Sequence, residues 1–391
     1  MDFQFTPQEE QFRADLRAFL GQHLPADWSD RSFIEAADSN DRKALADQMT
    51  KLLAQKDWLA LAWPKQYGGL DAGHLMQLIF NEETAYSAMP GGGGPGVTSV
   101  GPAIMLFGNQ EQKDTYLPRI TRGEDAWSLL YTEPGSGSDL ASIQTRAVRD
   151  GDTYVLNGQK VWIAGAQDAN MGWVAARTDP TGPKHKGLST IIVPMDAPGV
   201  TVRPLSTMDG ERTLSEVYLD NVRVPVENLV GTENRGWYQV AASLDFERSG
   251  VGAYANGRRN IEKLVDIAKD EREALGRNPR IRYELADRWL ELDVGFNIAY
   301  RIPYLQSQGL APNHEASVSK LYGSELTQRI ANTGIELLGL AGQLAPGSPG
   351  APLRGALVRA YLNAVSSTIA SGTSEIQRNI IAQRGLGMPR G

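Results

Sequence analysis

The sequence contains no cysteine and only four histidines, His23, His74, His185 and His314. Without cysteine the chain cannot form disulfides, thiolate metal sites or a cysteine nucleophile. With so few imidazoles, histidine-based catalysis is not expected, and no metal is predicted. The lack of disulfides is consistent with the reducing cytoplasm.

Positive charge is also scarce, because 39 lysines and arginines face 46 acidic residues and the formal net charge is -7. Such a chain offers no broad cationic field to a phosphodiester backbone, which argues against a nucleic acid partner. The first ten residues, MDFQFTPQEE, lack the cationic segment and apolar run of a signal peptide. No apolar run approaches the roughly 20 residues that span a bilayer. We therefore expect a cytoplasmic protein without a membrane span.

The periodicity of apolar residues changes twice along the chain. A capping box at Thr6-Pro7-Gln8-Glu9 predicts a first helix, and Asn109 is a second candidate cap. Short β-branched and aromatic runs begin near residue 126, and Asp150-Gly151 between two of them predicts a type I′ hairpin turn. Helical periodicity returns after about 235, which suggests an antiparallel bundle. The predicted helical segments are 41–56, 74–88, 109–121, 237–269, 280–309, 314–341 and 353–383, and the predicted domains are residues 1–125 (α-helical), 126–235 (β) and 236–391 (helical bundle).

Three stretches contain residues suited to chemistry. In LLYTEPGSGSDLAS, 129–142, a strand runs into a turn of small residues with hydroxyl donors, which could hold a phosphate or a polar ring edge or could be an ordinary turn. In NGQKVWIAGA, 157–166, Trp162 is either core or the wall of a cofactor site. In SLDFERSGVG, 243–252, Glu247 is either solvated or partly buried with a raised pKa.

Four motifs in order resemble the acyl-coenzyme A dehydrogenase family over essentially the whole chain: YTEPGSGSD, NGQKVWI, LDNVRVPVENLVG and GTSEIQRNIIAQRGLG. The resemblance implies a mixed α and β fold, with an N-terminal helical domain, a middle β-barrel domain and a C-terminal four-helix bundle. It implies an enzyme that uses FAD to oxidise an acyl-CoA to the trans-2-enoyl-CoA and passes electrons to an electron-transferring flavoprotein. The sequence also resembles bacterial members that act on steroid side chains.

The resemblance assigns the catalytic base to Glu247. Many family members carry the base directly before the glycine of the GT motif, where this sequence has Ser371. A second branch carries it on the first bundle helix as Glu before Arg, which matches Glu247-Arg248, with Arg248 expected as a structural residue or as a substrate contact on the CoA side. Ser371 is expected to contribute its backbone N–H to the oxyanion site, and Glu375 is a weaker candidate base.

The resemblance also implies the cofactor contacts. The 131–138 turn would lie along the flavin and its pyrophosphate, with Ser138 also near substrate, and Trp162 would pack against the flavin. Ala164 stands where the family often has a hydroxyl that donates to flavin N5, so its N–H is the expected replacement. The predicted FAD-binding residues are Tyr131, Thr132, Gly137, Ser138, Trp162, Ala164, Thr373 and Glu375.

Two inter-subunit motifs of the family match poorly. Arg-x-x-Phe-Gly is reduced to Arg272-Glu-Ala-Leu275-Gly276, and Gln-x-x-Gly-Gly to Glu336-Leu-Leu-Gly339-Leu340, which puts an acid near the expected FAD diphosphate. The assembly is therefore either a homodimer or homotetramer that binds FAD differently, or a heterotetramer with a related subunit. The alternatives in function are a non-catalytic scaffold subunit and a flavin oxidase or monooxygenase on the same fold. The expected pathway class is fatty acid or steroid side-chain β-oxidation.

Overall fold

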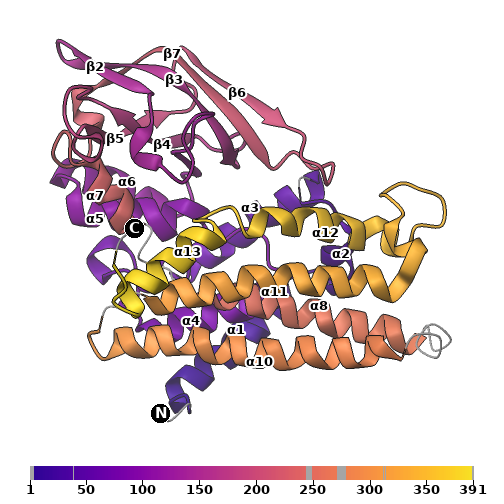
Figure 1. The fold of residues 1–391 in the computed structure, drawn as a ribbon. Coiled ribbons are helices and arrows are strands. Elements are labelled where there is room, and N and C mark those ends of the chain that lie inside the picture. Colours follow the sequence, from indigo (N-terminus) through magenta and orange to yellow (C-terminus); the bar gives the residue numbers. More distant parts are fainter. Residues whose placement is uncertain are drawn as a thin grey trace. The chain divides into compact units, whose positions relative to one another are not determined.

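The computed structural model describes residues 4–37, 39–243, 249–270, 279–310, 312 and 314–389. The chain forms two compact units, each assembled from separate stretches of sequence. Unit 1 comprises Met1–Ser39, Ala72–Pro90 and Arg248–Gly391, and unit 2 comprises Asn40–Asp71 and Gly91–Glu247. The helices and the curled sheet match the predicted mixed α and β fold (Figure 1).

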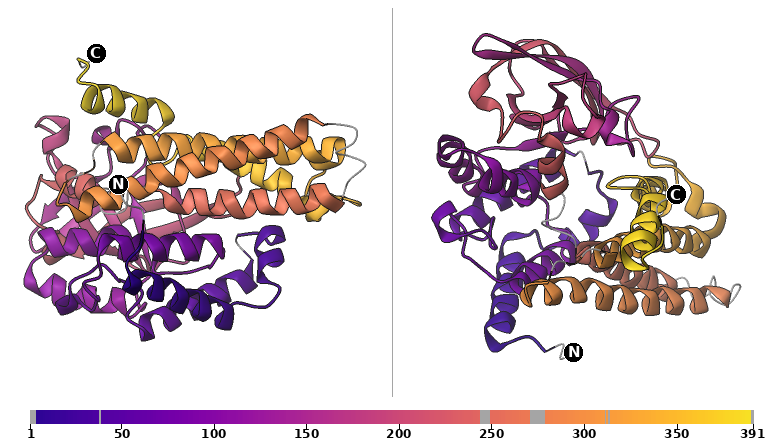
Figure 2. Two further views of the ribbon diagram at one scale, coloured as in Figure 1. Left: turned by 90° about the horizontal axis from the view of Figure 1, so that it is seen from below. Right: turned by 60° about the vertical axis from the view of Figure 1, so that its left-hand side comes forward.

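Unit 1 is helical. Three of its longest helices, α8, α10 and α11, run side by side in both views of the bundle (Figures 1 and 2). The helices of this unit are α1 (Pro7–His23), α2 (Trp28–Ile34), α4 (His74–Tyr86), α8 (Val251–Asp270), α10 (Arg280–Ser307), α11 (His314–Leu338), α12 (Ala356–Ser367) and α13 (Ser374–Ile380). The predicted capping box at Thr6 is confirmed, since its side chain accepts from the Glu9 N–H while Glu9 bonds back to Thr6.

Tyr254 lies at the centre of the bundle core, where its side chain is 1% exposed. Its hydroxyl donates to the Ser319 carbonyl at 2.8 Å, which satisfies the one polar atom of the ring. Gly295 is required for this packing, because a Cβ there would lie 2.3 Å from the Tyr254 ring. Gly323 faces the same ring, and a Cβ there would meet it at 3.3 Å. Two small residues on α10 and α11 thus make room for one large side chain from α8.

Buried charges join α1 to the rest of unit 1. The Arg13 guanidinium contacts the Glu83 carboxylate at 2.5 Å, and Arg17 binds the same carboxylate at 2.8 Å. The neighbouring Glu82 accepts from Arg13 and from the Tyr300 hydroxyl, the latter at 2.8 Å. Each carboxylate therefore has several donors, which offsets the cost of burying its charge.

Two predicted helices are interrupted. The predicted 237–269 helix is divided between α7 (Gly236–Ser243) and α8, because Gly250 takes φ +67°, which an α-helix does not allow. A Cβ at Gly250 would also lie 2.9 Å from the Ser319 hydroxyl. The predicted 353–383 helix is divided between α12 and α13 by a turn with positive φ at Ser371 and Gly372. The unbroken helices predicted at 237–269 and 353–383 are therefore wrong, whereas those predicted at 280–309 and 314–341 are confirmed as α10 and α11.

Unit 2 combines helices with a seven-stranded sheet in the order β1-β4-β2-β3-β7-β6, with β5 on β4. The strands are β1 (Trp127–Leu130), β2 (Arg146–Asp150), β3 (Thr153–Ala164), β4 (Met171–Arg177), β5 (Leu188–Pro194), β6 (Val200–Leu205) and β7 (Leu214–Pro225). The helices include α3 (Asn40–Gln55), α5 (Gly101–Phe107), α6 (Gln110–Thr121) and α7. Asn109 caps α6 in a complete capping box, as predicted.

The hairpin between β2 and β3 is confirmed, with Asp150 paired to Thr153 across a two-residue loop. Its predicted turn type is wrong. A type I′ turn needs positive φ at both central residues. Here Gly151 has φ +63°, and Asp152 is not in the left-handed region. One glycine therefore supplies all the left-handed backbone that this turn needs.

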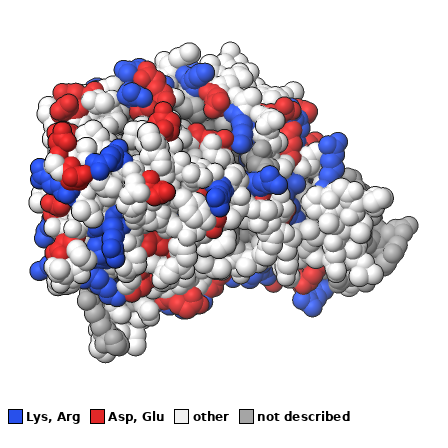
Figure 3. Space-filling view, turned by 90° about the horizontal axis from the view of Figure 1, so that it is seen from above, with Lys and Arg blue, Asp and Glu red and all other residues white. Residues whose placement is uncertain are grey.

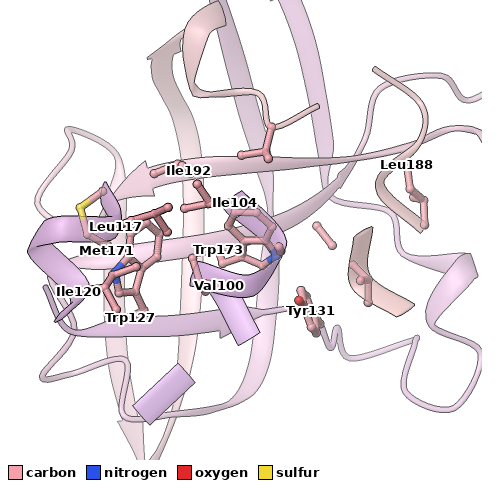
Figure 4. Close-up of a cluster of buried hydrophobic side chains, with 14 of the residues drawn as sticks. Val100, Ile104, Leu117, Ile120, Trp127, Tyr131, Met171, Trp173, Leu188 and Ile192 are labelled. Atoms are coloured by element: carbon pink, nitrogen blue, oxygen red, sulfur yellow. The ribbon is translucent and has the colours of Figure 1, made fainter. Parts of the chain in front are cut away.

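The helices of unit 2 pack on the sheet through an aromatic core (Figure 4). Trp127 and Trp173 from β1 and β4 lie among Val100 and Ile104 from the helical segments, and both tryptophans are buried. A second apolar cluster fills the other side of the curled sheet. The two clusters fix β1, which leads directly into the segment that carries the first predicted site.

The distribution of charge on the surface and the hydropathy of the helices agree with the sequence, which has mixed charges and no long apolar run. Basic and acidic side chains are interspersed over the face shown in Figure 3. Among the described residues, helices do not reach the combination of length and hydropathy that crossing a membrane requires.

Candidate active site

The segment after β1, residues 131–139, forms an open turn in unit 2. Glu133 and Ser136 exchange two backbone hydrogen bonds of 3.0 Å each, which closes the turn. Gly135 and Gly137 are exposed, and a Cβ at either would meet no atom within 4 Å. Ser138 is also exposed. The backbone at the tip of the 131–139 loop is therefore accessible to a ligand.

A buried ion pair anchors the 131–139 loop, and sequence reasoning missed it. Lys160 is 0% exposed, and its ammonium donates to the Tyr131 carbonyl at 3.0 Å, the Glu133 carboxylate at 2.9 Å and the Ala175 carbonyl at 2.8 Å. All three ammonium hydrogens thus have acceptors, which burial of a charge demands. Lys160 is part of the quoted NGQK motif, but the sequence gives no sign that it contacts a loop 27 residues earlier.

Both carboxylate oxygens of Glu133 accept hydrogen bonds. Besides Lys160, its carboxylate accepts from the N–H groups of Gln144 at 2.5 Å and Thr145 at 2.9 Å, which ties the start of the loop to the residues directly before β2. Burial raises the pKa of Glu133, but the lysine and these donors outweigh it and the net pKa is lowered. Burial lowers the pKa of Lys160 to about 8, against the opposing pull of Glu133. For Lys160 the effect of burial on the pKa dominates, because the lysine is the more deeply buried partner. For Glu133 the hydrogen bonds and the lysine charge dominate, because Glu133 has additional donors.

Trp162 lies on β3 in an unusual conformation. Its φ is +60°, and the register of β3 against β7 shifts between Lys160 and Ile163, as at a β-bulge. A bulge re-aims a side chain, and here the indole is 60% exposed. Positive φ is costly for a bulky residue. The alternative that Trp162 belongs to the core is therefore wrong for this structure.

The strand around Trp162 is joined directly to the 131–139 loop. The Val161 N–H donates to the Thr132 carbonyl at 3.0 Å. Two residues on, Ala164 is exposed, and its carbonyl accepts from the buried Ser128 hydroxyl at 2.9 Å. Tyr131 itself is buried with Trp173 in the aromatic core (Figure 4). Unit 2 therefore brings together the predicted flavin residues from 131 to 164 on one connected framework.

In unit 1, the predicted residues near the C-terminus gather at the turn between α12 and α13. Ser371 is exposed, with φ +55°, and Gly372 follows with φ +87°. Thr373 caps α13, accepting from the Ile376 N–H at 3.2 Å. The Glu375 side chain is 79% exposed, and hydrogen bonds from its own N–H and from Thr373 lower its pKa. A solvated carboxylate of lowered pKa is a weak base, which agrees with its secondary rank.

The predicted base, Glu247, lies outside the described residues, as do its neighbour Arg248 and the Arg272–Gly276 motif. Glu336 is described and has partners that the sequence did not suggest. Its carboxylate accepts from the Asn332 amide at 2.7 Å and lies 4.0 Å from the Arg280 guanidinium. The acid that seemed unfavourable for a diphosphate is therefore partly neutralised within its own chain.

Glu336 also lines a groove of about 1100 Å³ formed by α10, α11, α12 and α13. Thr373 and Glu375 line the same groove, so unit 1 places these three predicted residues around one space. Its lining is rich in both arginine and carboxylate side chains, and Arg378 is paired with Glu325 at 2.6 Å. The groove is polar and self-neutralised.

Comparison with known families accounts for nearly all of the chain. Residues 6–124 match the N-terminal domain of acyl-CoA dehydrogenases, residues 128–222 match the middle domain and residues 234–386 match the C-terminal domain. The three matches follow each other in the family's order.

Individual relatives are similar over their full lengths. Acyl-CoA dehydrogenase FadE26 of Mycobacterium tuberculosis is 36% identical over 403 residues, which covers 100% of this chain and 99% of the relative. The solved structure titled Tcur3481-Tcur3483 steroid ACAD has a TM-score of 0.89 at 36% identity, and the ChsE4-ChsE5 complex from Mycobacterium tuberculosis has a TM-score of 0.87 at 36% identity. Both structural matches cover 100% of this chain and 100% of the other. With all three domains matched in order and full-length relatives at this identity, the chain belongs to the acyl-CoA dehydrogenase family of oxidoreductases.

Proposed function

We propose that this chain catalyses the FAD-dependent α,β-dehydrogenation of an acyl-CoA thioester to the trans-2-enoyl-CoA. The observation that carries the proposal is Trp162, whose exposed indole stands on a left-handed residue joined to the open 131–139 loop. Strained backbone of this kind concentrates at ligand sites, and an outward aromatic offers a surface for a flat ring. The residues fit a flavin, because the ring can pack on Trp162 while Thr132 and Ser138 supply hydroxyls beside accessible backbone.

The reaction removes a proton from the α-carbon and a hydrogen with its electron pair from the β-carbon. FAD, when bound, supplies the acceptor for that electron pair. Glu247 takes the α-proton, with Arg248 beside the substrate. Negative charge then develops on the thioester oxygen, where a fixed donor is most effective. The Ser371 N–H is that donor, so the position retains a catalytic role without a carboxylate.

The names of the structural relatives support a steroid side-chain acyl-CoA as substrate and a second subunit as partner. One relative is titled a steroid ACAD, and another is titled a complex of two differently named chains. We propose a heterotetramer with a related subunit that completes FAD binding. An electron-transferring flavoprotein then reoxidises the reduced FAD. If the chain instead reduces oxygen, hydrogen peroxide will form in proportion to enoyl-CoA, which would identify an oxidase.

The first test is the visible spectrum of the chain purified alone and with a co-expressed related subunit. We expect a flavin band that anaerobic steroid acyl-CoA bleaches faster than short or branched acyl-CoAs do. A chain that is colourless alone but yellow with the partner would support the heteromer. A flavin-loaded protein that none of these acyl-CoAs bleaches would overturn the proposed activity.

Ser371→Ala tests whether the backbone, rather than the hydroxyl, acts at this position. Alanine keeps the N–H and takes the same exposed site, so the variant is expected to retain most of the wild-type turnover at unchanged KM. Steady-state assays with the acyl-CoA that bleaches the flavin provide the measurement. A loss as large as that expected on removal of the Glu247 carboxylate would mean that the hydroxyl is essential.

A further inference from the structure

We propose that Lys320 is a positioning residue that holds the turn at Ser371 and Gly372 so that the Ser371 N–H is presented to the substrate. This inference rests on the proposed role of that N–H and adds to it the side chain that orients it. Lys320 lies on α11, 52 residues before Gly372 in the sequence.

The turn is held from one side by hydrogen bonds to its carbonyls. The Lys320 ammonium donates to the Gly372 carbonyl at 2.7 Å and to the Ser367 carbonyl at 3.1 Å. The Gln377 amide donates to the carbonyls of Ser371 at 3.2 Å and Gly372 at 3.4 Å. Hydrogen bonds from a charged donor are the shorter and stronger kind, so Lys320 is the dominant anchor.

Ser371 needs such an anchor because of its backbone. Its φ of +55° is unfavourable for a residue with a Cβ, and such conformations persist only where the surroundings determine them. The bonds to the carbonyls of Ser371 and Gly372 fix the two peptide planes that follow Ser371. Without them, the residue is expected to relax toward negative φ, which rotates its N–H.

The N–H itself remains available. Ser371 is exposed, and within the part of the chain that the structure describes its N–H has no backbone acceptor. The carbonyls of Ser371 and Gly372 accept from protein side chains, while the Ser371 N–H is left for a ligand. The bound carbonyls fix the backbone and the N–H has no backbone acceptor, as a pre-oriented hydrogen-bond donor requires.

The test compares Lys320→Met, which removes the donors, with Lys320→Arg, which keeps donors and charge. Gln328→Met is the matched control, because Gln328 lies on the same helix and donates to the Ala364 carbonyl at 3.2 Å and the Thr368 hydroxyl at 3.1 Å, before the turn itself. Each variant is prepared as the FAD-loaded complex. The first readout is hydrogen–deuterium exchange of the peptide that covers residues 368–374, and the second is kcat and KM with the acyl-CoA that bleaches the flavin.

We expect Lys320→Met to speed exchange in this peptide and to lower kcat on the order of 10- to 100-fold at nearly constant KM, since a small displacement of a catalytic donor has effects of this size. Lys320→Arg should recover part of the loss, and Gln328→Met should leave kcat unchanged. Unchanged exchange in Lys320→Met would overturn the inference, and so would faster exchange with wild-type kcat. If neither the wild-type protein nor any variant converts the acyl-CoA, the proposed function fails. The exchange experiment still decides whether Lys320 holds the turn.

Discussion

Glu247→Gln is expected to lower turnover on the order of 10²- to 10⁴-fold, the range that a positioned proton acceptor contributes. Glutamine has nearly the same shape as glutamate but cannot take the α-proton at neutral pH. FAD content should stay at the wild-type level, because the predicted cofactor contacts lie elsewhere, between residues 131 and 164 and at 373 to 375. Anaerobic single-turnover bleaching of the flavin band measures the chemical step directly.

Glu375→Gln is the matched control for this prediction. Its carboxylate is solvated and its pKa is lowered, so its removal should change the bleaching rate of the flavin-loaded protein little. Because Glu375 is also a predicted FAD contact, the rate is compared per bound flavin. If Glu375→Gln abolishes bleaching while Glu247→Gln does not, the assignment of the base is reversed. If both variants bleach at the wild-type rate, neither carboxylate is the base.

Lys160→Met is expected to destabilise the fold by about 3–5 kcal/mol, because it leaves the Glu133 carboxylate buried without its cation. The Tyr131 carbonyl loses its lysine donor as well, so the 131–139 loop should loosen and FAD content should fall. Urea unfolding followed by tryptophan fluorescence gives the stability, and the ratio of flavin to protein absorbance gives the FAD content.

Two further variants separate the buried pair from lysine loss in general. Lys160→Met with Glu133→Gln should recover part of the stability, since the uncompensated charge is removed while one acceptor remains for the N–H groups of Gln144 and Thr145. Lys184→Met breaks an exposed pair with Asp139 and should leave the unfolding midpoint nearly unchanged. A Lys160→Met protein as stable as wild type would contradict the role given to the pair.

The same pair predicts a pH dependence with a defined sign. The pKa of Lys160 is lowered from 10.5 in the unfolded chain to about 8 in the fold, so between these values the unfolded state binds more protons. Stability from this group is therefore complete above pH 10.5 and is lost as pH falls through about 8. The difference in unfolding midpoint between wild type and Lys160→Met should widen as pH rises from 8 to 10, and a constant difference would contradict the shift.

Local sequence signals predicted local structure well. The caps at Thr6 and Asn109 are confirmed because a capping box involves residues only three positions apart. The interruptions at Gly250 and Ser371 were missed because apolar periodicity continues on both sides of a short turn. In each case a glycine lies at or next to the break, and it is the one local signal in the sequence that apolar periodicity does not include.

The candidate site was predicted only in part, because sequence patterns locate short motifs but not contacts between residues far apart in the chain. The motifs around Trp162 and Ser371 could be located from their order along the chain, and the structure adds their backbone strain. Lys160 and Lys320 could not be assigned, because the carbonyls they bind lie far away in sequence and the sequence does not distinguish a lysine that binds backbone carbonyls from a solvated one. Contacts of this kind depend on the completed fold.

Both lysines hold their loops through main-chain carbonyls, and this has a consequence for how such a protein can diverge. A carbonyl is present whatever side chain the residue carries. Apart from Glu133, whose carboxylate pairs with Lys160, side chains in the 131–139 loop and at position 371 can therefore be exchanged over evolutionary time while Lys160 and Lys320 preserve the path of the backbone. A serine at position 371 is compatible with this anchor, because the bond from Lys320 goes to a backbone carbonyl and not to that side chain.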